Sequence, residues 1–84
     1  MPDDGDSDVT TLDATGLSCP LPVLRARKAL GRVAAGATLA IRATDRAAPA
    51  DFEAFCREAG HGFLGVAEDA GVYTITLRKA GSSR

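Results

Sequence analysis

Hydrophobic and polar residues follow strand or helix spacing in six successive segments of the chain. Val9 to Ala14, with two threonines before Leu12, predicts a first strand. Apolar residues then recur three or four positions apart as far as about Ala35, which predicts a helix that begins at Pro20. Gly36 stands where a left-handed C-cap would end this helix. The predicted apolar face consists of Val23, Ala26, Leu30, Val33 and Ala34.

The second half of the chain predicts one more helix and three more strands. Thr38 to Thr44 alternates as a half-buried strand does, and about Pro49 to Ala59 has helical spacing. Two further strands, at about Gly62–Glu68 and Val72–Lys79, flank the turn Asp69-Ala70-Gly71. The sides expected to face the core consist of Leu39, Ile41 and Ala43 in the strand and Phe52, Phe55, Cys56 and Ala59 in the helix.

The element order β-α-β-α-β-β predicts an α/β (α+β) fold, a two-layer sandwich. In this fold a four-stranded mixed sheet carries both helices on one face. The 84 residues suffice for one domain, whose core must be thin. We expect residues 1–8 to form a disordered acidic lead-in, residues 9–80 the single domain and residues 81–84 a loose tail.

Charge is distributed unevenly along the chain, although the formal net charge is only −1. Four of the eleven acidic residues lie in the first eight positions, so the rest of the chain carries an excess of bases. This excess favours acidic partners, but it is too small to predict direct nucleic-acid binding. The start of the chain lacks a secretory signal and no stretch could cross a bilayer, so we expect a cytoplasmic protein without membrane association.

The segment Gly16-Leu17-Ser18-Cys19-Pro20-Leu21-Pro22 indicates the chemistry, because it places a thiol at, or one residue before, a helix start. Free backbone N–H groups and the helix dipole favour a thiolate there, so we expect a lowered Cys19 pKa. Pro20 and Pro22 fix the helix start, and Gly16 lets the chain turn into it. A thiolate in this place could capture sulfane sulfur, form a mixed disulfide or react with peroxide. The alternative is a cysteine that only packs or caps the helix.

This segment, together with Leu12-Asp13 before it, resembles the signature of the TusA/SirA-like sulfur-carrier family, whose hallmark is a Cys-Pro-x-Pro motif opening the first helix. The resemblance covers about residues 10–79 and continues at Ala43-Thr44-Asp45, Asp51 through Cys56, Gly60-His61 and Tyr73-Thr74-Ile75. It implies a sulfurtransferase that accepts sulfur on Cys19 as a persulfide from a cysteine desulfurase or rhodanese-type donor. It also implies a downstream acceptor protein, as in tRNA thiolation, sulfur oxidation or molybdenum-cofactor pathways.

Several other residues have two interpretations. We expect Asp45 to serve a turn or a cap, but at the same end of the sheet as Cys19 its carboxylate would raise the Cys19 pKa and shape a partner surface. Cys56 lies on the apolar stripe of the second helix and is expected in the core rather than as a resolving thiol. For His61 and Asp13 we expect local hydrogen bonds, and a catalytic base at His61 is the alternative.

Basic residues on the first helix (Arg25, Arg27, Lys28 and Arg32) are either a solvated face or a docking surface for an acidic partner. The competing function is therefore a non-catalytic regulatory or interaction module that uses this basic face, and a third is a thiol redox sensor. Two distant cysteines and one histidine predict neither a metal site nor a disulfide in a reducing cytosol. We expect no cofactor and a monomer in isolation.

Overall fold

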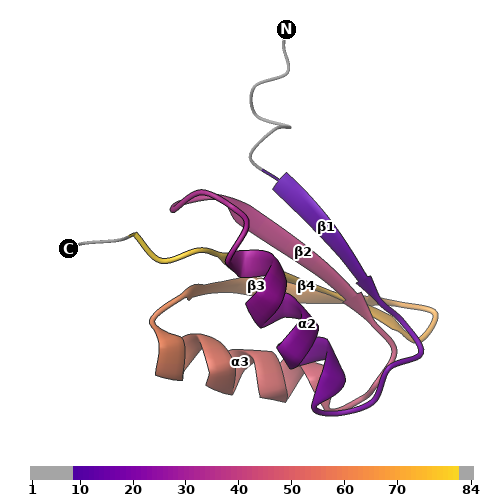
Figure 1. The fold of residues 1–84 in the computed structure, drawn as a ribbon. Helices are drawn as coiled ribbons and strands as arrows, with labels where there is room; N and C mark the ends of the chain where they lie inside the picture. The colour runs from indigo at the N-terminus through magenta and orange to yellow at the C-terminus, as the bar shows by residue number, and fades with distance from the viewer. Residues whose placement is uncertain (1–8, 82–84) are drawn as a thin grey trace, which may run out of the picture.

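Two helices cover one face of a four-stranded sheet in the computed structural model (Figure 1). The structure describes residues 9–81, so the expectations for residues 1–8 and 82–84 lie outside the described residues. The elements are β1 (Val9–Ala14), α2 (Leu21–Leu30), β2 (Thr38–Ala43), α3 (Ala48–Ala59), β3 (Gly62–Asp69) and β4 (Val72–Arg78). The predicted fold class is confirmed.

The strands lie in the order β1-β2-β4-β3. β1 pairs with β2 in parallel, with Val9 opposite Thr38 and Ala14 opposite Ala43. The other two pairings, β2 with β4 and β4 with β3, are antiparallel. Since a parallel pair needs a crossover, α2 carries the chain back across the sheet. The carboxyl ends of β1 and β2 therefore meet at one edge.

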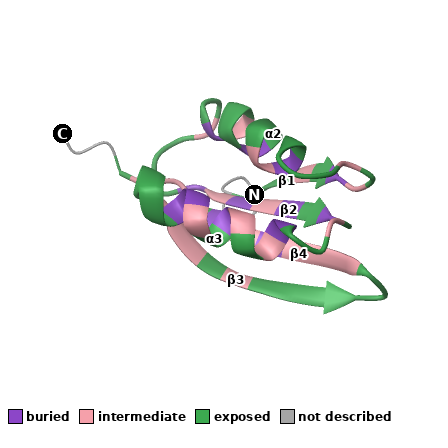
Figure 2. Ribbon diagram, turned by 90° about the horizontal axis from the view of Figure 1, so that it is seen from below, coloured by how far each residue is buried: buried purple, intermediate pink, exposed green. Residues whose placement is uncertain are grey.

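The core lies between the helices and the sheet (Figure 2). The alternation predicted for β2 is confirmed, because the three residues on its apolar side are fully buried. The sheet face opposite the helices is lined by intermediate and exposed residues, so the molecule has one core layer. The largest fully buried side chains are those of Phe52, Leu39, Ile41, Ile75, Leu77, Pro22 and Cys56.

The predicted end of the first helix is wrong, because α2 ends at Leu30 and not near Ala35. Gly31 follows, and a glycine costs a helix about 1 kcal/mol relative to alanine. The next N–H groups donate to carbonyls three residues back, as Arg32 does to Ala29 at 3.0 Å, which makes a tight turn. Gly36 has the expected positive φ of 85°, but it lies in the loop before β2 and is no helix cap.

Smaller differences concern the other element boundaries. Pro20 is the N-cap of α2 and not its first helical residue, and α3 begins one residue early, at Ala48. The turn between β3 and β4 has two residues, Ala70 and Gly71, with φ of 53° and 84°. Two successive positive φ angles are typical of a tight hairpin whose twist matches that of its strands.

Replacing Phe52 by alanine tests the core. The ring has no exposed surface, so its loss leaves a cavity, and we expect the free energy of unfolding to fall by about 3–5 kcal/mol. Urea denaturation followed by circular dichroism measures this change. Leu24→Ala on α2 is the control, since Leu24 is 52% exposed and should cost less than about 1 kcal/mol. Equal costs at the two positions would contradict this packing.

Candidate functional site

Two loops meet where β1 and β2 end. The chain leaves β1 after Ala14 and leaves β2 after Ala43, and these two residues are paired across the sheet. The N–H of Gly16 donates to Thr44 Oγ1 at 2.9 Å, which ties one loop to the other. Gly16 has a φ of 83°, a conformation that residues with a Cβ rarely adopt. Its expected role in turning the chain toward the helix is consistent with this geometry.

Asp45 holds the backbone of Cys19. One carboxylate oxygen, Oδ2, accepts the N–H of Cys19 at 2.6 Å, and the other, Oδ1, accepts the N–H of Ala47 at 3.1 Å. The hydrogen bonds from Ala47 and from Cys19 lower the pKa of the Asp45 carboxyl. One oxygen therefore serves the turn of Asp45 itself, as expected, while the other fixes the cysteine loop.

The start of α2 presents Cys19 to solvent. Cys19 is exposed, whereas Pro22 is buried and anchors the first turn. The N–H of Leu21 donates to Ser18 O at 2.8 Å, and the N–H of Leu24 donates to Pro20 O at 3.1 Å. The first turn is thus closed by backbone bonds and by the two prolines, without a side-chain cap.

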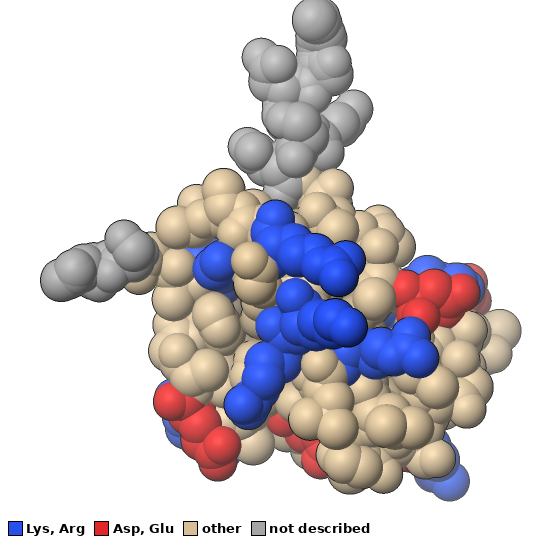
Figure 3. Space-filling model, viewed as in Figure 1, with Lys and Arg blue, Asp and Glu red and all other residues tan. Residues whose placement is uncertain are grey.

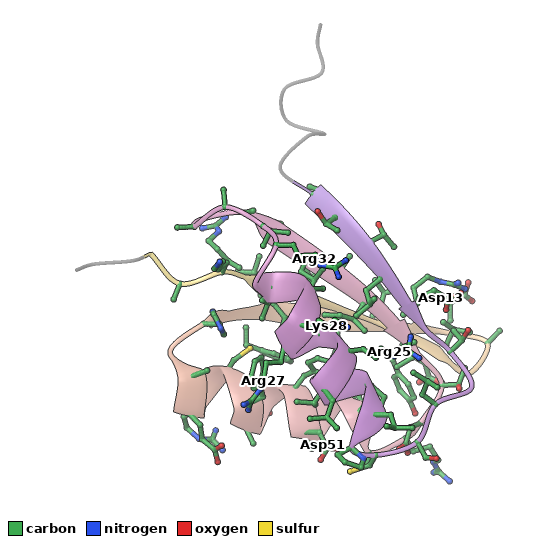
Figure 4. All side chains as sticks on the ribbon, viewed as in Figure 1. Asp13, Arg25, Arg27, Lys28, Arg32 and Asp51 are labelled. Carbon is green, nitrogen blue, oxygen red and sulfur yellow. The ribbon has the colours of Figure 1, made fainter. Side chains whose placement is uncertain are left out.

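A shallow hollow of about 230 Å³ extends from Cys19 between α2 and α3. Asp51, in the first turn of α3, lies beside the start of α2 (Figure 4). Arg27 crosses from α2 toward α3, with its guanidinium 5.5 Å from the centre of the Phe55 ring. The residues that line the hollow are Cys19, Pro20, Val23, Arg27, Asp51, Ala54, Phe55 and Glu58.

The expected lowering of the Cys19 pKa is wrong for the chain by itself. Its pKa is raised, first because the S–H donates to the Asp51 carboxylate, then by desolvation and by the negative charges of Asp51 and Asp45. The helix start also offers few donors to a thiolate. Pro20 and Pro22 have no N–H, and the N–H of Leu21 already donates to Ser18.

Asp51 was not a candidate from residue patterns alone, although it fell within the resembling segments. Two signals could have found it. An acidic residue in the first turn of a helix favours that helix start. This helix also follows β2, whose carboxyl end lies beside that of β1.

Basic side chains form a band over α2 (Figure 3). Arg25, Lys28 and Arg32 are exposed and line a second hollow on the β1 side, with Leu12 and Ala29. Arg27 points instead toward α3 (Figure 4). The expected basic face is therefore divided: three cations form an outer flank, and one cation belongs to the hollow that contains Cys19.

The remaining candidates have local roles. The thiol of Cys56 is buried, which raises its pKa, and donates weakly to Gly62 O at 3.9 Å, so the core interpretation is confirmed. His61 Nδ1 accepts the N–H of Ala80 at 2.9 Å. His61 follows the carboxyl end of α3, a helix of 12 residues and about 18 Å, whereas Cys19 lies beside its start. This placement contradicts a base role for His61. The expected turn hydrogen bond is also wrong, because the partner of His61 is Ala80, which follows β4 and lies 19 residues further along the chain.

Asp13 makes the local hydrogen bonds expected of it. Its Oδ1 accepts the N–H and the hydroxyl of Thr15, at 3.0 and 2.7 Å, and these bonds lower the Asp13 pKa. Within residues 9–81 no group of three or more potential metal ligands comes together. No helix in the described part of the chain is long and apolar enough to cross a membrane.

Fold and site together define a small two-layer protein that presents one exposed thiol at the start of its first helix. The same architecture occurs in the crystal structure of a SirA-like protein from Desulfitobacterium hafniense, with a TM-score of 0.74 and 27% sequence identity. The match covers 86% of this chain and 97% of that one. The family described as Sulfurtransferase TusA matches residues 10–79, and the chain belongs to this family.

Relatives of similar length are 39% to 54% identical to this chain over 68 or 69 residues. A Neisseria meningitidis protein provisionally named a sulfur carrier is 54% identical over 68 residues, which are 81% of this chain and 92% of that protein. The sulfur carrier protein TusA of Pseudomonas entomophila is 46% identical over 82% of this chain and 86% of its own length. The sulfur carrier protein TusA of Allochromatium vinosum is 39% identical over 82% of this chain and 91% of its own length.

Asp45→Asn tests the bond that holds the cysteine loop. An amide offers one acceptor oxygen where Asp45 uses two, so we expect a lower urea midpoint than that of the wild type at neutral pH. Because folding lowers the Asp45 pKa, the ionised carboxylate stabilises the folded protein above pH 3.8, which is its ordinary pKa. This stabilisation is lost as the pH falls through the lowered pKa. The difference between the two proteins should therefore shrink below pH 3.8.

Glu53→Gln is the matched control, since it removes one exposed carboxylate from α3. It should leave the urea midpoint close to that of the wild type. An Asp45→Asn protein with the wild-type midpoint at neutral pH would show that the two hydrogen bonds do not stabilise the fold.

Proposed function

We propose that the chain is a sulfur-relay protein that accepts sulfane sulfur on Cys19 as a persulfide and transfers it to an acceptor protein. The observation that carries this proposal is the exposed Cys19 thiol, held at the helix start by Asp45. Relatives of similar length that are named sulfur carriers support it. The donor would be a cysteine desulfurase or a rhodanese-type protein.

The transfer needs no cofactor and no external oxidant. The Cys19 sulfur, as thiolate, attacks the outer sulfur of the donor's persulfide. A new S–S bond forms on Cys19 while the donor's S–S bond breaks, and the donor leaves as a thiolate that takes up the proton lost by Cys19. In the second transfer the acceptor's thiolate attacks the outer sulfur on Cys19, and Cys19 leaves. The sulfane sulfur keeps its oxidation state in both steps.

An open site suits a carrier. Cys19 lies at the end of a shallow hollow and not in an enclosed pocket, so two large partners can reach it in turn. The partner then supplies the remainder of the environment in which the S–S bond is exchanged. The pathway that such a relay serves, whether tRNA thiolation, sulfur oxidation or molybdenum-cofactor synthesis, depends on the partner.

The basic band over α2 favours a second candidate, a non-catalytic interaction module (Figure 3). Arg25, Lys28 and Arg32 would then bind an acidic partner without any reaction at Cys19. The two functions differ in their need for the thiol, since a Cys19→Ser protein would keep full activity as an interaction module and none as a sulfur carrier.

Persulfide loading tests the leading proposal directly. The purified chain is incubated with a cysteine desulfurase and cysteine, or with a rhodanese and thiosulfate, and its intact mass is measured. We expect a gain of one sulfur atom that reductant removes. Cys19→Ser should gain none, whereas Cys56→Ser, which changes the buried cysteine, should load as the wild type does. No gain with either donor, or an equal gain in Cys19→Ser, would contradict the proposal.

Charge reversal on the outer flank of α2 tests docking. We expect Arg25→Glu/Lys28→Glu to slow loading by the protein donor on the order of tenfold at low salt, because electrostatic attraction raises association rates. Added salt should reduce the difference. Arg57→Glu/Arg78→Glu, the same charge change at exposed positions on α3 and β4, is the control. Equal slowing in both variants would indicate an effect of net charge alone.

A further inference from the structure

Carboxylates outnumber cations around the Cys19 thiol. Asp45 accepts the N–H of Cys19, and Asp51 on α3 lines the same hollow as Cys19. Glu58, about two helical turns further along the same face of α3, also lines this hollow. Arg27 is the cation among the residues that line this hollow, and its guanidinium lies over the Phe55 ring.

Of these acids, Asp51 lies in the hollow beside Cys19, at the start of α2 (Figure 4). Asp45 is occupied at both oxygens by backbone N–H groups, so it fixes the loop and affects the thiol only through its charge. Asp51 is placed by the first turn of α3, where a negative charge is favoured by the helix dipole and stays in place. Its position therefore does not depend on the cysteine.

We propose that Asp51 is a positioning residue that holds the Cys19 sulfur in the hollow between α2 and α3 and keeps it unreactive in the isolated chain. This inference rests on the proposed sulfur-relay function and specifies its regulation. A protonated thiol is a poor nucleophile, so the free carrier reacts slowly with small electrophiles and oxidants. Cys19 becomes reactive when a partner brings positive charge against Asp51.

A constraint on the donor follows from this arrangement. Within residues 9–81, Asp45 and Asp51 are the two acids that bear on the Cys19 thiol. Pro20 and Pro22, which follow it, have no backbone N–H that could donate to a thiolate. The donor must therefore carry a lysine or arginine side chain close to its own persulfide, where it can pair with Asp51 as the thiolate forms. A neutral, small persulfide lacks such a group and would load the carrier slowly.

Alkylation of Cys19 by iodoacetamide, followed by mass spectrometry, tests the inference without any sulfur transfer. The rate is measured across the titration of the thiol in the wild type and in Asp51→Asn. We expect the midpoint of the pH–rate profile to move to lower pH in Asp51→Asn, with alkylation several-fold faster at neutral pH. The plateau at high pH should fall slightly, because a thiolate of lower pKa is intrinsically less nucleophilic. Asp51→Ser, which suits a helix start, should shift the midpoint in the same direction.

Glu53→Gln is again the control, because it removes the same charge from the same helix at an exposed position. Its midpoint should match the wild type, and Asp51→Glu, which keeps the charge, should stay closer to the wild type than Asp51→Asn does. An Asp51→Asn protein that has the wild-type circular dichroism spectrum and the wild-type midpoint would overturn the inference while leaving persulfide loading on Cys19 intact. A shifted midpoint in a chain that never gains sulfur would instead refute the sulfur-relay function alone.

Discussion

The parallel pairing of β1 with β2 determines where Cys19 lies. Because Ala14 and Ala43 are paired, the loops that follow them leave the same edge of the sheet. One loop carries Cys19, and the other carries Thr44 and Asp45, whose side chains accept backbone N–H groups of the first loop. An antiparallel pairing would have sent the two loops to opposite edges. The site therefore depends on the crossover through α2 and only then on the residues of the loops.

The prolines at the helix start have two opposing consequences. They position Cys19 by fixing the entry into α2, and the buried Pro22 ties that entry to the core. They also remove two N–H groups from the turn where a thiolate would otherwise be stabilised. With Asp51 and Asp45 nearby, the chain holds the sulfur in a defined place without activating it. In a carrier that meets several partners, a thiol that stays unreactive between encounters avoids side reactions with small electrophiles and oxidants.

The spacing of apolar residues, together with the glycines and prolines between the elements, was enough to predict most of the fold. The twofold alternation of β2 identified its three core residues, because a strand with one buried face must alternate. The end of α2 was predicted five residues late, because apolar spacing continues through Val33, which packs on the core from a turn. Cys19 was accessible to motif reasoning, but the raised pKa of its thiol was not. That depends on Asp51, which reaches Cys19 only when α3 packs beside α2.

The surface around Cys19 is electrostatically divided, and this division constrains how a partner can approach. The hollow between α2 and α3 carries Asp51 and Glu58, whereas the opposite flank of α2 carries Arg25, Lys28 and Arg32. A partner that matches both regions needs a cation near its own reactive sulfur and acids some distance from it. A partner that approaches α2 from solvent satisfies both requirements in one orientation, since rotation by half a turn about the direction of approach places like charges together, which is unfavourable. The uneven charge of this small domain can therefore orient a partner, whereas the shallow hollow offers little shape complementarity for that purpose.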